Sequence, residues 1–153
     1  MSRKLIGQSM IEAQLISKEQ LDWLLERQKK AAERVLFGRL TVELDIVTER
    51  ELASFLANYF GVPYVDLQEY LMVQKEALDA VPESVAKRLN VLPLVRENGS
   101  LTVAISDPLD LTAIENLETI THCRIKPVVS SPVQIRYNIE VMYQINKEKE
   151  EQE

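Results

Sequence analysis

The hydrophobic positions of the first sixty residues occur twice with the same spacing. The segment from Leu5 to Gln28 aligns without a gap on the segment from Leu36 to Tyr59. Identical residues recur at these aligned pairs: Leu5/Leu36, Gly7/Gly38, Glu12/Glu43, Leu21/Leu52 and Leu25/Leu56. Other apolar residues recur at these pairs: Ile11/Val42, Leu15/Ile46, Ile16/Val47 and Leu24/Phe55. Because a repeated hydrophobic spacing indicates a repeated buried face, residues 1–61 are predicted to form two copies of one helical hairpin.

Each copy contains a helix-start signal. The segments 17–20 and 48–51 begin with Ser17 and Thr48 and end with Gln and Glu, which is the pattern of a reciprocal capping box. Each is flanked by an apolar pair typical of a hydrophobic staple: Ile16 with Leu21, and Val47 with Leu52. We therefore expect helices to begin directly after Ser17 and Thr48. Trp23 lies off the apolar stripe of its helix, and it is predicted to cover a neighbouring helix or, alternatively, a partner surface.

The second half of the chain mixes helical and strand patterns. Residues 62–67 predict an extended connector, and helices are expected at 75–80 and 83–89. Alternating residues at 91–95 and 101–105 flank a Gly-containing turn and predict a β-hairpin. A helix from Asp107, with an apolar stripe of Leu111, Ile114, Leu117 and Ile120, precedes a strand at 124–129. A last helix should begin at Ser131 with another capping box.

The predicted fold class is α+β. A helical tandem-repeat sub-domain (1–61) precedes a small α/β sub-domain with a three-stranded sheet (62–145). Residues 146–153 are almost entirely charged and polar. They are predicted to have nothing to pack against, as a frayed helix end or a linker.

Composition and charge exclude some classes of binding partner. The chain has a net charge of -6, from 24 acidic and 18 basic residues, which disfavours binding to a nucleic-acid backbone. No apolar run approaches a membrane span, and Gln8, Ser9 and Glu12 interrupt any signal-peptide core. We therefore expect a cytoplasmic chain without membrane insertion. The single cysteine, Cys123, is interpreted as a small buried hydrophobic residue.

Candidate catalytic chemistry is sparse. The four glycines are isolated, so no Gly-rich turn ending in Lys and Ser or Thr can hold phosphates. His122 is the only histidine, which excludes a His-based metal cluster. The carboxylate pair Asp107 and Asp110 is explained by helix capping. We expect no catalytic residue, no metal and no cofactor, and hence no enzyme activity in this chain.

Several strings resemble a known family. They are residues 60–67 (FGVPYVDL), 91–94 (VLPL) and 101–110 (LTVAISDPLD), which follow the tandem helical hairpins in order. Together they resemble the N-terminal domain (MshEN or GspE N-terminal domain) of type II secretion and type IV pilus ATPases, over residues 3–145. The resemblance implies a domain ahead of an ATPase core that this chain lacks. It also implies docking to the cytoplasmic domain of an inner-membrane platform protein, or cyclic di-GMP binding as in some pilus motors.

The cyclic di-GMP motif of this family is only partly present. The first copy keeps Gly7, Ile11, Leu21, Leu25 and Gln28, and the second keeps Gly38, Val42, Leu52 and Leu56. The departures are Leu5 and Leu36 in place of Arg, Gln14 and Asp45 in place of a second Gly, and Tyr59 in place of Gln. Three nearby cations could substitute for the missing arginines: Arg3, Lys4 and Arg39. Protein docking is therefore the first hypothesis, a degenerate cyclic di-GMP site the alternative, and a structural spacer the third.

Overall fold

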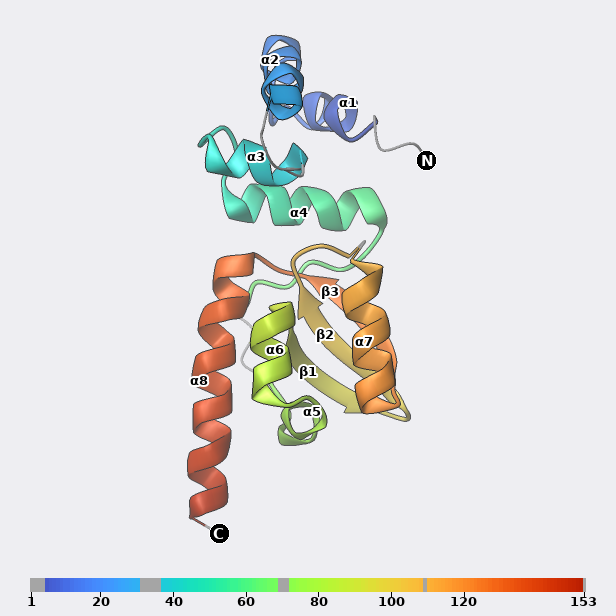
Figure 1. Ribbon diagram of the computed structural model, residues 1–153, viewed down its shortest axis with the longest axis vertical. Coiled ribbons are helices and arrows are strands. Elements are labelled where there is room, and N and C mark those ends of the chain that lie inside the picture. Colours follow the sequence, from blue (N-terminus) through green and yellow to red (C-terminus); the bar gives the residue numbers. More distant parts are fainter. Residues whose placement is uncertain (1–4, 31–36, 69–71, 109, 153) are drawn as a thin grey trace.

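The computed structural model describes residues 5–30, 37–68, 72–108 and 110–152, and it has the predicted α+β architecture (Figure 1). Its elements, in order, are α1 (Leu5–Glu12), α2 (Lys18–Lys30), α3 (Phe37–Glu43), α4 (Glu49–Phe60), α5 (Lys75–Ala80), α6 (Glu83–Leu89), β1 (Leu92–Glu97), β2 (Ser100–Ile105), α7 (Leu111–Thr121), β3 (Arg124–Val129) and α8 (Pro132–Glu151). The helical pairs α1–α2 and α3–α4 are the two copies of the repeat.

One hydrophobic core joins the two copies. Its buried members come from both copies: Met10, Ile16, Leu21, Leu24, Leu40, Val47, Leu52 and Phe55. The members include all four residues of the predicted hydrophobic staples. Since neither hairpin could bury its apolar face alone, the repeat folds by pairing one copy with the other.

Both capping boxes predicted for the repeat are formed. In the first, the amide of Gln20 donates to Ser17 Oγ at 3.1 Å, and the amide of Ser17 donates to Gln20 Oε1 at 2.8 Å. In the second, the amide of Glu51 donates to Thr48 Oγ1 at 3.1 Å, and the amide of Thr48 donates to Glu51 Oε1 at 3.0 Å. The starts of α2 and α4 are thus confirmed.

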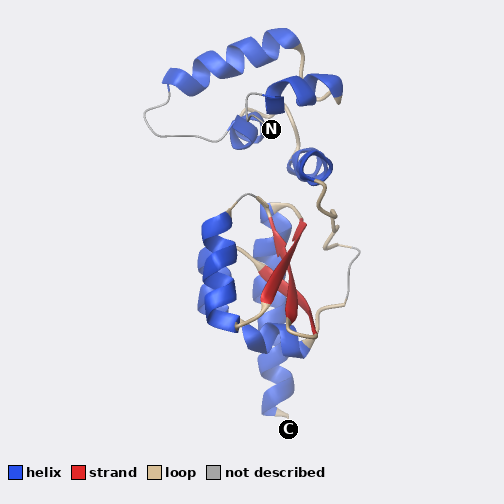
Figure 2. Ribbon diagram, turned by 90° about the vertical axis from the view of Figure 1, so that its right-hand side faces the viewer, coloured by secondary structure: helices blue, strands red, loops and turns tan. Residues whose placement is uncertain are grey.

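Helix α4 lies between the other helices of the repeat and the α/β half (Figures 1 and 2). Leu52 and Phe55 face the helical core, whereas Ala53 and Ala57 pack on Val129 of β3. Because α4 is buried on both sides, it is the element that joins the two halves.

The connector after α4 is extended, as predicted, and pairs with β3. The amide of Val65 donates to Val129 O at 2.9 Å, and the amide of Val129 donates to Pro63 O at 2.8 Å. Tyr64 therefore forms a parallel bridge with Val129. Figure 2 shows the connector on the side of the sheet away from α7.

The sheet has the order β1-β2-β3, with β1 antiparallel and β3 parallel to β2. Asn98 and Gly99 form the hairpin turn with φ of 48° and 79°, the two positive angles that a type I′ turn requires. Helix α7 makes the crossover between the parallel strands β2 and β3, as predicted.

The predicted apolar stripe of α7 is only partly buried. The helix starts at Leu111, after Asp110 accepts from the amide of Ala113 at 3.1 Å, and not at Asp107. Leu111 is 62% exposed and Ile120 is 39% exposed. Steps of three residues drift by about 60° around a helix, so the ends of such a row leave the face centred on Leu117. The residues buried on that face are Ala113, Leu117 and Thr121.

Helix α8 differs from the prediction at both ends. Ser131 accepts from the amide of Gln134 at 3.2 Å, but Gln134 Oε1 accepts from the amide of Leu67 at 3.2 Å and does not complete the capping box. The expectation that residues 146–153 have nothing to pack against is not met, because α8 continues to Glu151 and Asn146 is 9% exposed. The polar side chains of this last part find partners on α5 and α6.

Candidate functional site

The motif glycines are the points where paired helices approach each other. A Cβ atom on Gly7 of α1 would lie 2.5 Å from Leu21 Cδ1 of α2. A Cβ atom on Gly38 of α3 would lie 3.2 Å from Leu52 Cδ1 of α4. Both distances are shorter than ordinary van der Waals contact. The pairs Gly7–Leu21 and Gly38–Leu52, which belong to the nucleotide motif, therefore pack the two hairpins.

The remaining motif positions are divided between core and surface. Ile11, Val42 and Leu56 are partly buried and pack against the helical core. Leu25 is 41% exposed, and Gln28 is half-buried. Most of the motif that survives in this chain thus contributes to the core of the helical half.

The positions of the motif's second glycine have a special backbone conformation. Gln14 and Asp45 have φ of 63° and 58°, in the left-handed region that favours glycine. Each follows the end of its helix: the amide of Leu15 donates to Met10 O, and the amide of Ile46 donates to Thr41 O. The turn geometry therefore persists although neither residue is glycine.

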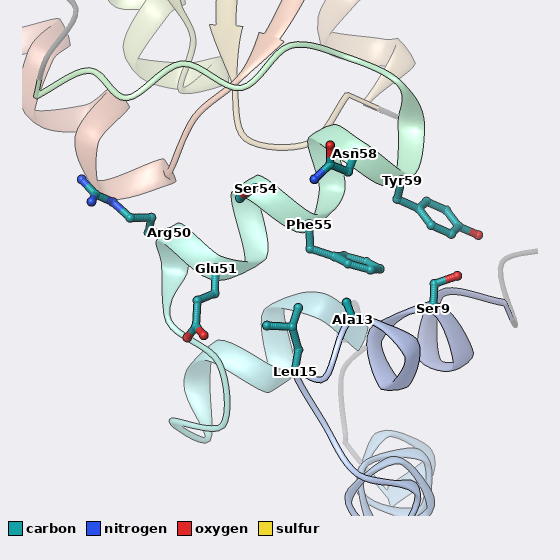
Figure 3. A pocket seen from close by; sticks show the side chains of 9 residues that line it. All are labelled: Ser9, Ala13, Leu15, Arg50, Glu51, Ser54, Phe55, Asn58 and Tyr59. Carbon is teal, nitrogen blue, oxygen red and sulfur yellow. The ribbon is translucent and has the colours of Figure 1, made fainter.

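A pocket of about 560 Å³ lies between α1, the turn that follows it, and α4 (Figure 3). The lining residues are Ser9, Ala13, Leu15, Arg50, Glu51, Ser54, Phe55, Asn58 and Tyr59. Phe55 and Tyr59 stack with ring centroids 5.7 Å apart and 26° between the planes. Tyr59 thus places an aromatic ring where the motif expects Gln. The pocket was not predicted from the sequence, although two aromatic residues four apart on a predicted helix indicate that their rings lie side by side.

The charged residues that line the pocket, Arg50 and Glu51, and the candidate cation Arg39 all have partners within the chain. Arg39, a candidate substitute for the missing arginines, has Nη2 2.6 Å from Glu49 Oε1. Arg50 is ion-paired with Asp66 of the connector. Hydrogen bonds from the backbone and then the side chain of Thr48 lower the pKa of Glu51, which keeps this carboxylate ionised at the pocket wall. The other two candidates, Arg3 and Lys4, lie outside the described residues.

The outer face of α2 exposes an aromatic side chain. Trp23 is 48% exposed, so it does not cover a neighbouring helix as expected. The guanidinium carbon of Arg27 lies 5.6 Å from the centre of the indole ring, within range of a cation–π interaction. Leu21 and Leu24 fill the core from the opposite face of the helix. We call Trp23 and Arg27 the α2 surface.

His122, Cys123 and Asp110, which were considered for catalysis or metal binding, have roles in helix termination, packing and capping. His122 ends α7 with φ of 55°, Cys123 is buried, and Asp110 caps α7. Among the described residues, no group of three His, Cys, Asp or Glu side chains is placed to hold a metal ion. Within the same part of the chain, no helix has the length and apolar character needed to cross a membrane.

The structure is a repeat-built helical half joined through α4 to a small α/β half. The sequence model of the MshEN domain matches residues 60–148, and the chain belongs to this family. It corresponds to the N-terminal domain of type IV pilus assembly ATPases, and it lacks their ATPase core.

The curated relatives include type IV pilus assembly ATPases. It is 34% identical over 138 residues to the type IV pilus assembly ATPase PilB of Myxococcus xanthus, covering 90% of this chain and 24% of that protein. The PilB of Pseudomonas aeruginosa is 32% identical, with coverage of 74% and 20%. Bacteriophage adsorption protein B of Escherichia coli K12 is 30% identical, with coverage of 73% and 14%. The chain thus spans about a quarter or less of these relatives.

Solved structures match both halves of the chain. The structure of MshE with cdg has a TM-score of 0.78 and 29% identity, and the match covers 92% of this chain and 98% of that one. The N-terminal domain of XpsE has a TM-score of 0.69 and 21% identity, with coverage of 92% and 97%, which supports the fold alone.

Proposed function

We propose that this chain is a non-catalytic docking and regulatory domain of a type IV pilus or type II secretion ATPase. It attaches the motor to the cytoplasmic domain of an inner-membrane platform protein, so the chain works in the cytoplasm and reaches the membrane through that partner. The observation that carries the proposal is the α2 surface, where an exposed Trp23 lies beside Arg27. Tryptophan and arginine are the residues most enriched among interface hot spots.

The position of α2 suits a docking role. Figure 1 shows α2 at the end of the molecule that is far from the sheet, so a partner there does not meet the α/β half. The connector 62–67, by contrast, is hydrogen-bonded to β3 through Val65 and Pro63. A tethered domain of this kind raises the local concentration of its motor, so a modest affinity suffices.

The direct test is the affinity of the 153-residue chain for the purified cytoplasmic domain of the platform protein from the same system. Trp23→Ala should weaken binding at least about tenfold, since truncating a hot-spot residue costs about 2 kcal/mol or more. The matched control is Leu111→Ala, which removes an exposed leucine from α7 in the other half and should leave the affinity unchanged. No binding by the intact chain, or equal losses in both variants, would refute the proposal.

The second candidate function is cyclic di-GMP binding. It is favoured by the likeness to MshE with cdg and by the stacked rings of Phe55 and Tyr59 at the pocket. Against it, Leu cannot supply the forked hydrogen bonds of Arg, and Arg39 is paired with Glu49. The ionised Glu51 also disfavours an anionic ligand. We infer weak or no binding, and calorimetric titration tests this: saturable binding at low micromolar concentration that Arg39→Ala abolishes would make this the preferred function.

A further inference from the structure

Helix α8 carries a row of apolar side chains on its solvent face. Val133, Tyr137 and Ile145 are 55%, 68% and 40% exposed, and Val141 is half-buried between the latter two. These four residues, the α8 row, are spaced four apart and so form one continuous ridge along the helix. Single exposed apolar residues are ordinary on protein surfaces, but a contiguous row of them marks an interaction site.

The α8 row cannot turn inward, because the opposite face of the helix is held in the core. Ile135, Ile139 and Tyr143 are buried, and the Tyr143 hydroxyl donates to Val81 O at 2.8 Å. Exposure of the α8 row is therefore a fixed property of the domain.

Polar contacts hold the last turns of α8 in the same rotation. Asn146 Nδ2 donates to Asp79 Oδ1 at 3.0 Å, and Lys147 Nζ lies 2.7 Å from Glu83 Oε1. Lys75 Nζ lies 3.1 Å from Glu150 Oε1. The α8 row therefore lies on a helix that is already held in place, so binding a partner costs little conformational entropy in this helix.

The charged side chains of α8 that lie beside the α8 row are mainly acidic. Glu140, Glu148 and Glu151 are exposed and lie within about 60° of Tyr137 around the helix axis. Of the cations in this helix, Lys147 is paired with Glu83. The other two, Arg136 and Lys149, lie about 100° or more from Tyr137 around the axis. The row therefore faces solvent beside an excess of negative charge.

We propose that the α8 row binds a basic amphipathic helix of a partner protein. A ridge of residues four apart fits the groove between the ridges of another helix, so an α-helix is the matching shape. The glutamates would pair with Lys or Arg flanking the apolar face of that helix. A second copy of this chain would bring like charges together, and an anionic membrane would be repelled. In Figure 1, α8 extends toward the end of the molecule opposite α2, so this surface is separate from the docking surface proposed above.

A labelled peptide of Leu and Lys at helical spacing is the probe, and fluorescence anisotropy against the full 153-residue chain is the measurement. The peptide should bind saturably, and a peptide with Glu in place of Lys should bind at least about tenfold more weakly. Tyr137→Ser/Ile145→Ser should weaken binding of the Lys peptide by a similar factor. The matched control, Leu111→Ser/Ile120→Ser, removes two exposed apolar residues from α7 and should bind like the intact chain.

A charge variant and a second row variant make the test independent of any loss of folding. Glu140→Lys/Glu148→Lys should reverse the preference between the two peptides, and Val133→Ser alone should weaken the Lys peptide. Circular dichroism melts identify any variant that is unfolded. Equal binding of the Lys peptide by the row variants and the α7 control overturns the proposal. Row-dependent dimerisation in sedimentation velocity, without peptide binding, also overturns it and assigns the row to a second copy.

Discussion

At the scale of single residues, a nucleotide motif and a packing motif overlap in this chain. The family resemblance predicts Gly7 and Gly38 to be part of a ligand motif, yet each lies where its helix touches a leucine of the next helix. The presence of these glycines is therefore explained by packing of the helical core and is not evidence for a ligand.

Replacing the two glycines by alanine should separate their packing roles. A methyl group at Gly7 forces Leu21 to move, whereas the 3.2 Å approach at Gly38 needs a shift of only a few tenths of an ångström. Overpacking destabilises by about 1–3 kcal/mol, whereas alanine stabilises a helix by about 1 kcal/mol relative to glycine. Gly7→Ala should thus lower the free energy of unfolding by about 1 kcal/mol, and Gly38→Ala by less than about 0.5 kcal/mol. Urea denaturation measures both, and the reverse order would contradict the packing described here.

The left-handed residue Gln14 offers a stabilising substitution. A residue with a Cβ atom pays about 1–2 kcal/mol in this conformation, and glycine loses about 0.5–1 kcal/mol of chain entropy instead. Gln14→Gly should therefore raise the free energy of unfolding by about 0.5 kcal/mol. The control Gln14→Ala keeps the positive φ and should not stabilise. Thermal melts in which both variants behave alike would show that the turn is not left-handed.

At the scale of elements, neighbouring residues in the sequence predict where helices start. Contacts with residues far along the chain determine the role of Gln134 and where the last helix ends. The starts of α2 and α4 follow from capping residues a few positions apart, so they were predictable from the sequence. The role of Gln134, which accepts from Leu67, depends on a residue 67 positions away. The helical end of the chain likewise depends on α5 and α6, since Asn146 contacts Asp79 and Lys147 contacts Glu83.

The capping boxes of the repeat should contribute similar stability. Ser17→Ala and Thr48→Ala each remove a side-chain acceptor for an amide of the first turn. Each variant should lose about 1 kcal/mol of stability. Ser17→Asp is the control, because an aspartate also accepts from the first-turn amides and should retain most of that stability. Unchanged melts for both alanine variants would contradict the cap geometry.

The contacts of α8 with α5 and α6 should make the stability of the domain sensitive to acid. Lys147 and then Lys87 lower the pKa of Glu83 from its ordinary 4.5, and Lys75 and then Asn146 lower the pKa of Asp79 from 3.8. Unfolding raises both pKa values, so the stabilisation is complete above pH 4.5 and is lost as pH falls through the lowered values. Because these groups are partly exposed, each contributes about 1 kcal/mol or less.

A variant at Glu83 tests whether the folded state lowers the pKa of this carboxyl group. Glu83→Gln should lower the melting temperature at pH 7 and flatten its fall below pH 4.5. Glu115→Gln, an exposed carboxylate of α7, should leave the acid limb unchanged. A steeper acid limb in Glu83→Gln would contradict the lowered pKa.

At the scale of the whole molecule, the fold class and both halves were predictable, but the candidate surfaces were not. Hydrophobic periods of two and of three to four residues identify strands and helices without reference to their neighbours. Whether Trp23 is covered depends on how α2 packs on α1 and α3, and whether Phe55 and Tyr59 border a pocket depends on how α1 packs on α4. A local sequence pattern specifies neither arrangement. The joint at Ala53 and Ala57 is of the same kind, because its partner Val129 lies far along the chain.

The central claim is that the helical half binds a platform protein through α2 and does not bind a nucleotide. An amide and indole chemical-shift titration of the isotope-labelled chain tests it in one sample series, with the platform protein's cytoplasmic domain and with cyclic di-GMP. We predict that the platform domain shifts the Trp23 indole and neighbouring α2 amides saturably, and that cyclic di-GMP shifts nothing comparably. Saturable shifts around Phe55 and Tyr59 with cyclic di-GMP, and unshifted α2 signals with the platform domain, would contradict the account.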